Sequence, residues 1–120
     1  MGKKFVVLLI LLVSSIIAYG QTYKNWDSKN IDKFYEKVSV KNGTLSEDGS
    51  KISYVFVPCE IKQGVYEVRI VEYKKDLYEI QGTDYYVTFS FFVGYWGYVG
   101  KNGILEVGSA SWSSKFYIQP

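Results

Sequence analysis

The stretch from Asp84 to Gly108 constrains the fold most, because it holds the densest run of aromatic side chains in the chain. In its first half apolar and polar residues alternate, a period-2 pattern typical of a half-buried strand. The apolar set is Tyr85, Val87, Phe89, Phe91 and Val93. The Asn102-Gly103 pair lies between two β-prone runs and favours a type I′ turn, which needs positive φ at both central residues. The sequence therefore predicts a central hairpin that returns through Ile104–Val107.

Two turn dipeptides predict a three-stranded unit nearer the N-terminus. As a two-residue loop, Asn42-Gly43 places Val40 opposite Leu45. Asp48-Gly49 then places Leu45 opposite Ile52, so that one apolar row crosses three strands. The third of these strands runs toward a proline, which cannot donate a ladder hydrogen bond and therefore marks a strand end or a sheet edge.

The second half of the chain continues as short strands. Gly64–Tyr73 alternates between an apolar and a polar face. A three-residue loop at Lys74–Asp76 opposes Ile70 to Ile80, whereas a two-residue loop would require positive φ at both lysines. Lys115–Ile118 is predicted as a short closing strand.

Only the segment 21–38 leaves helix and strand open. Ile31, Phe34, Tyr35 and Val38 recur at three- and four-residue spacing, which favours a short N-terminal helix ending near Lys37. The predicted fold class is all-β: a small antiparallel meander curled into a barrel or a two-layer sandwich, either of which hides sheet edges. One short N-terminal helix is the optional addition.

The first 20 residues predict a signal peptide. Lys3 and Lys4 supply the positive start, and Phe5–Ala18 has the length of a signal h-region. Ala18-Tyr19-Gly20 predicts cleavage before Gln21. A membrane anchor is the alternative, but a spanning helix needs about 20 apolar residues and this run is shorter. We therefore expect residues 21–120 to form one exported β-domain, periplasmic, cell-surface or secreted, with no membrane span after cleavage.

Composition limits the chemistry of that domain. The full chain carries 14 Lys and Arg against 12 Asp and Glu. Lys3 and Lys4 leave with the leader, so the exported chain is balanced and lacks the clustered basic surface that nucleic acid requires. The chain has no histidine, which excludes His-based catalysis and His-ligated metals. We predict no metal and no cofactor. Cys59 is the only cysteine, so no internal disulfide forms. A buried apolar residue at a strand end is the favoured interpretation of Cys59, and a free thiol or an intermolecular disulfide is the alternative.

Two alternatives to a binding role stay open. Glu67, Glu72 and Glu79 lie on adjacent predicted strands and could serve a carboxylate-based hydrolase, although charge pairing on a wet sheet face is the favoured interpretation. A self-associating envelope or surface protein would use an uncovered edge near Pro58 or Phe116–Ile118.

The best functional lead is a set of aromatic residues in glycine- and serine-rich segments. Tyr95, Trp96 and Tyr98 lie among three glycines, and Trp112 lies in a polar loop. Planar amphipathic rings suit stacking on sugars or docking a protein, whereas the competing interpretation is core packing. The sequence thus predicts a non-catalytic, exported binding or inhibitory domain that recognises a glycan or a protein through Tyr95, Trp96, Tyr98 and Trp112.

Overall fold

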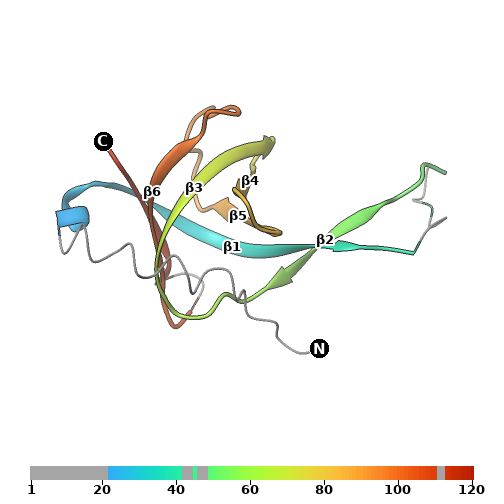
Figure 1. The fold of residues 1–120 in the computed structure, drawn as a ribbon, viewed down its shortest axis with the longest axis horizontal. Helices are drawn as coiled ribbons and strands as arrows, with labels where there is room; N and C mark the ends of the chain where they lie inside the picture. The colour runs from blue at the N-terminus through green and yellow to red at the C-terminus, as the bar shows by residue number, and fades with distance from the viewer. Residues whose placement is uncertain (1–21, 42–44, 46–48, 111–112) are drawn as a thin grey trace.

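The chain is built from strands connected by turns and longer loops (Figure 1). The computed structural model describes residues 22–41, 45, 49–110 and 113–120. In this part of the chain the elements are the 3-10 turn η2 (Thr22–Asn25), β1 (Asp27–Ser39), β2 (Tyr54–Cys59), β3 (Gly64–Lys74), β4 (Leu77–Ile80), β5 (Tyr85–Phe89), β6 (Lys101–Val107) and β7 (Lys115–Ile118). No helix in these ranges is long and apolar enough to cross a membrane. The predicted signal peptide and Trp112 lie outside the described residues.

Six strands close into an antiparallel barrel in the order β1-β5-β4-β3-β6-β7, and pairing between β7 and β1 completes the ring. The long strand β1 makes this closure possible. Its first residues, Asp27–Asn30, pair with β7, and its last, Phe34–Ser39, pair with β2. Strand β2 is thus an addition outside the barrel, and the β1–β2 ribbon projects away from it (Figure 1). The all-β prediction is confirmed, and the barrel is the alternative that the chain adopts.

The predicted N-terminal helix is wrong, since the segment beyond η2 is strand β1. Ile31 and Phe34 are nevertheless both buried, as their helical spacing suggested. Residues three apart on a regular strand face opposite ways, but the β1–β5 register shifts between Ile31 and Lys33. This bulge turns both side chains into the barrel and so produces a helix-like pattern in a strand.

The predicted three-stranded unit is also wrong. Ser39 pairs with Tyr54 and the Val40 N–H donates to Ser53 O at 3.0 Å, so the first run pairs directly with the third. Leu45 of the second run bridges to Lys51 rather than to Ile52. Asn42-Gly43 and Asp48, which belong to the two predicted turns, lie outside the described residues. The proline prediction is confirmed, because Pro58 lies in β2, the terminal strand of the sheet.

The predicted register between β3 and β4 is confirmed. Ile70 pairs with Ile80 across the β3–β4 loop, where Asp76 takes a φ of 65°. The inward-facing side chains of β3 are all buried and are Tyr66, Val68 and Ile70. The closing strand is β7, but it pairs with β1 as well as with β6, so Phe116–Ile118 is no free edge.

The Asn102-Gly103 hairpin does not form, because both residues lie inside β6. Strand β6 pairs with β3 and β7 rather than with the strand before it, and β5 already ends at Phe89. Glycine serves close packing here: a Cβ at Gly103 would lie 2.0 Å from Tyr117 O and 2.8 Å from Phe116 Cε1.

An outer aromatic cluster holds the ribbon against the barrel. The Phe56 ring packs edge-on against Tyr86 at 4.8 Å and Tyr73 at 5.6 Å between centroids. The Tyr54 and Tyr73 hydroxyls are 2.8 Å apart, and this hydrogen bond, with burial, raises the pKa of Tyr73 to about 12. Lys37 Nζ lies 4.9 Å from the centre of the Tyr54 ring, completing the cluster with a cation–π contact.

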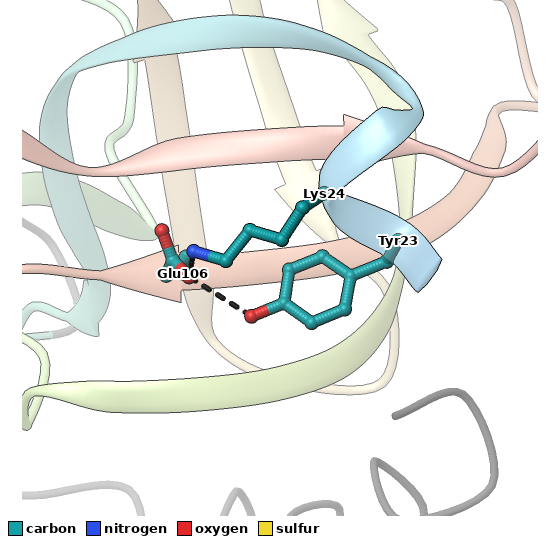
Figure 2. A network of polar contacts seen from close by, with 3 residues as sticks. All are labelled: Tyr23, Lys24 and Glu106. Carbon is teal, nitrogen blue, oxygen red and sulfur yellow. Dashed lines mark hydrogen bonds and ion pairs between the residues drawn. The ribbon is translucent and has the colours of Figure 1, made fainter. Parts of the chain in front are cut away.

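The turn η2 is fixed to the barrel by one carboxylate (Figure 2). Glu106 on β6 accepts hydrogen bonds from Tyr23 Oη at 2.9 Å and from Lys24 Nζ at 2.6 Å. Partial burial raises the pKa of Glu106, but the hydrogen bonds from Lys24 and Tyr23 outweigh it and leave the pKa below its ordinary value. The Tyr23 ring also packs edge-on against Tyr117 at 5.2 Å.

Because the folded-state pKa of Glu106 is lowered, its contribution to stability is present above the ordinary carboxyl pKa and is lost as pH falls through the folded value. We expect the wild type to exceed Glu106→Gln in stability at pH 7 by about 1 kcal/mol or less, since Lys24 is solvent-screened. The difference should close below about pH 4. Urea denaturation of both proteins at pH 7 and pH 3 measures the difference in their free energy of unfolding. If that difference is the same at pH 3 as at pH 7, the ionised carboxylate of Glu106 does not contribute to stability.

Candidate functional site

The segment between β5 and β6, residues 90–100, carries the most exposed apolar side chains of the described chain, and we call it the aromatic loop. Its five outward side chains are 68–92% exposed: Phe91, Phe92, Tyr95, Tyr98 and Val99. The loop contains no charged residue. Large exposed apolar patches on soluble domains mark interaction sites.

The backbone of the aromatic loop is held by side chains of β3 and β4. Glu72 Oε1 accepts hydrogen bonds from the Trp96 N–H at 2.9 Å and the Gly97 N–H at 3.1 Å. The Glu72 N–H in turn donates to Gly97 O at 3.1 Å. On β4, Tyr78 Oη donates to Gly94 O at 3.1 Å. Side-chain hydrogen bonds to charged groups are the stronger kind, so the exposed rings stand on a fixed backbone.

Glycines allow this path. Gly94, Gly97 and Gly100 all have positive φ, a conformation that other residues adopt only with strain. At Gly100 a Cβ would lie 2.3 Å from Ile70 O, so the loop can approach β3 only without a side chain there. Arg69 donates to Val99 O and to Asn102 Oδ1, which fixes the end of the loop where β6 begins.

Trp96 points the other way, into the end of the barrel. Its ring packs against Tyr78 at 5.1 Å, Phe89 at 5.4 Å and Phe116 at 6.0 Å between centroids. The indole Nε1 donates to Val93 O at 3.2 Å. Trp96 is therefore a half-buried plug that anchors the loop, in keeping with the core-packing alternative.

The other two predicted site residues that the structure describes are exposed on the aromatic loop. Tyr95 and Tyr98 are among the most exposed side chains of the described chain. Phe91 and Phe92 lie on the same loop but are not among the predicted site residues, because the sequence pattern places them in the central strand. The adjacent pair Phe91-Phe92 breaks the period-2 alternation, and this was the signal that the strand had ended.

A groove runs between the aromatic loop and the β3–β4 turn. It has a volume of about 430 Å³ and is lined by Glu72, Lys75, Asp76, Tyr78, Phe92 and Tyr95. A second hollow of about 370 Å³ shares Asp76, Tyr78 and Phe92 with it and extends along β5 to Asp32 on β1. The Phe92 and Tyr95 rings meet edge to face, with centroids 5.2 Å apart and planes at 69°.

Comparison of the chain with known protein families, with curated proteins and with solved structures finds no match. The chemistry of the aromatic loop and its groove is therefore the basis for assigning a role.

The three glutamates considered for hydrolysis do not converge. Glu72 lies at the barrel end, where its carboxylate holds the aromatic loop. Glu67 and Glu79 alternate with buried neighbours on β3 and β4, so they face outward from the barrel. Glu79 lies opposite Val71 in the β3–β4 pair. Arg69 donates a hydrogen bond to Val99 O in the aromatic loop.

Cys59 ends β2 opposite Phe34 and packs against the barrel core, as expected for a small apolar residue at a strand end. Burial, with the negative charges of Glu36 and Glu60, raises the pKa of its thiol to about 11. Such a thiol is a poor nucleophile at neutral pH.

Removing the Glu72 carboxylate should loosen the aromatic loop. We expect Glu72→Ala to lower the free energy of unfolding by about 1–3 kcal/mol, because two backbone N–H groups lose their acceptor. Amide hydrogen exchange at Trp96 and Gly97 should accelerate more than exchange in β6. Glu79→Ala, on the outward face of β4, is the matched control and should leave both amides protected. Equal protection in the two variants would contradict the anchoring role of Glu72.

Proposed function

We propose that this chain is a non-catalytic binding domain whose aromatic loop docks onto an apolar surface of a partner protein. The observation that carries the proposal is the display of five large apolar side chains on a backbone that is hydrogen-bonded in place. Exposed rings in water are costly unless they are covered, and a preformed backbone reduces the entropy lost on binding. Tyrosine and phenylalanine are also enriched where interfaces gain most of their energy.

Three of the five exposed side chains, Phe91, Phe92 and Val99, have no hydrogen-bonding group. A sugar ring presents hydroxyls at its rim, and a binding site for it supplies matching donors and acceptors beside the stacking ring. An apolar protein surface makes no such demand. The side chains of the loop therefore favour a protein over a glycan, and an inhibitory role would follow if the covered surface belongs to an enzyme.

The predicted leader supports export of this domain. A single cysteine with a raised thiol pKa suits an oxidising compartment, because it does not readily form mixed disulfides. A partner would accordingly be found in the periplasm, at the cell surface or in the medium.

The test compares Phe91→Ser/Phe92→Ser with Val55→Ser/Val57→Ser, which removes exposed apolar side chains from the projecting ribbon instead. The wild type and both variants are immobilised, after thermal melts show that all three are folded, and are exposed to envelope proteins of the source organism and to a polysaccharide array. We expect one defined protein to bind the wild type and the ribbon variant and to bind the loop variant at least about tenfold more weakly. Equal binding by all three would overturn the loop as the surface, and loss of a glycan instead would overturn the choice of a protein.

A further inference from the structure

We propose that the groove beside the aromatic loop binds an organic cation, supplied by an arginine or lysine side chain of the docked partner. This inference rests on the proposed function and adds to it the chemistry that the surface selects. It combines three features of one place in the fold: aromatic walls, a buried aromatic floor and carboxylates at the rim.

The walls are the Phe92 and Tyr95 rings, which stand nearly perpendicular with their centroids 5.2 Å apart. Both rings are largely exposed, so apart from the face that meets the edge of the other ring they are open to a ligand. The floor is Tyr78, which is buried and whose hydroxyl is fixed on Gly94 O. A cation within about 6 Å of such rings is attracted by their quadrupoles, and converging rings are the arrangement that recognises alkylated ammonium groups.

The charges on the rim favour a cation over a neutral ligand. Glu72 and Asp76 both line the groove, and Asp32 lies in the adjoining hollow. Among the described residues no ion pair neutralises Asp76, which sits in the β3–β4 loop with an exposed side chain. Glu72 shares its charge with two loop N–H groups, so Asp76 is the carboxylate with the greater capacity to bind a ligand.

The negative field of these groups is felt inside the groove. Burial raises the pKa of Tyr78 first, and the charges of Glu72 and Asp76 raise it further by opposing a phenolate. A field that disfavours an anion at the floor favours a cation at the same point.

Lys75 is the one basic side chain in the lining. It is exposed and forms no ion pair within the described ranges, and its long flexible stem allows it to leave the groove. Its charge opposes an incoming cation, so removal of that charge should strengthen binding rather than weaken it. A groove that selects an anion or an uncharged ligand would not behave in this way.

The test is a titration of the folded domain, followed by the backbone amide signals of Asp76, Phe92 and Tyr95 in ¹⁵N NMR spectra. The probes are Nα-acetyl-arginine amide, choline, and 3,3-dimethyl-1-butanol, which has the shape of choline without its charge. We expect both cations to give saturable shifts and the neutral alcohol to bind at least about fivefold more weakly. Asp76→Asn should weaken both cations about three- to tenfold and leave the alcohol unchanged, whereas Lys75→Gln should strengthen them.

Every other outcome contradicts one part of the proposal. Equal affinity for choline and its neutral counterpart would overturn cation selectivity. Binding of choline without the arginine derivative would overturn a partner side chain as the source and point to a quaternary ammonium ligand. Absence of saturable shifts with all three probes would overturn the groove site. In every case binding of the partner protein by the wild type, compared with the single variant Phe91→Ser, tests protein docking independently, because Phe92 lines this groove and Phe91 does not.

Discussion

Trp96→Ala is expected to lower the free energy of unfolding by about 3 kcal/mol, within the range for deleting a large aromatic side chain from a packed site. The indole ring fills the end of the barrel between Tyr78, Phe89 and Phe116, and its removal leaves a cavity beside three rings. Chemical denaturation of the purified domain measures the change. The loss should be larger than for any exposed side chain of the aromatic loop.

Tyr98→Ala is the matched control, because Tyr98 lies two residues away with its side chain 92% exposed. Its stability should stay within about 0.5 kcal/mol of the wild type, as for most surface substitutions. If Trp96→Ala were equally mild, the indole would not be the plug that anchors the loop, and Trp96 would return to the set of ligand-binding candidates.

Gly103→Ala should destabilise the barrel by at least about 3 kcal/mol, at the upper end of the cost of overpacking. A Cβ at this position would meet the Tyr117 carbonyl oxygen at 2.0 Å and the Phe116 ring at 2.8 Å. Backbone atoms cannot yield as a side chain can, so β6 and β7 would have to separate where Gly103 pairs with Ile118. Thermal unfolding and far-ultraviolet circular dichroism measure the effect.

Gly64→Ala provides the comparison, because it adds the same methyl group to a barrel strand. There the three nearest atoms all belong to the Tyr66 side chain, the first at 3.1 Å, so the methyl group requires a shift of one ring by a few tenths of an ångström rather than the separation of two strands. A cost below about 1 kcal/mol is expected, since alanine also suits a strand better than glycine. Equal losses at the two positions would show that steric contact with β7 is not the reason for glycine at 103.

The sequence correctly predicted those strands whose pairing or ends are set by residues close to them in the chain. The Ile70–Ile80 register of the β3–β4 hairpin was predicted correctly because a two-residue loop at Lys74-Lys75 would need positive φ at both lysines, whereas in the structure Asp76 alone of these residues has positive φ. The connection itself is shorter than predicted, since Lys74 pairs with Leu77 and the register shifts between Glu72 and Lys74. The closing strand Lys115–Ile118 and the edge position of Pro58 followed in the same way. An all-β class was predictable because strand signals dominate the chain.

Long-range packing decided what the local patterns missed. Ile31 and Phe34 share a face only because β1 bulges against β5, and nothing local distinguishes this from a helix. Asn102-Gly103 carries a strong turn signal, but the glycine is required by the approach of β7, a strand more than ten residues further along.

The candidate site was predicted in its location and only partly in its residues. Glycines at 94, 97 and 100 correctly marked a bent, ring-bearing segment, and Tyr95 and Tyr98 are exposed. Trp96 faces inward because the barrel end needs a large side chain, a need that exists only once β4, β5 and β7 are assembled. The groove carboxylate Asp76 comes from a distant turn, and local spacing in the sequence does not connect it to the loop.

The central claim is that exposed rings stand on an ordered backbone, and ¹⁵N relaxation of the folded domain tests it most directly. The account predicts order parameters for residues 93–100 near those of the barrel strands, about 0.8 or higher, because Glu72 and Tyr78 hold this backbone. Values below about 0.6 across the same residues would contradict it. The aromatic loop would then be a flexible segment, and neither the docking surface nor the groove would exist before a partner binds.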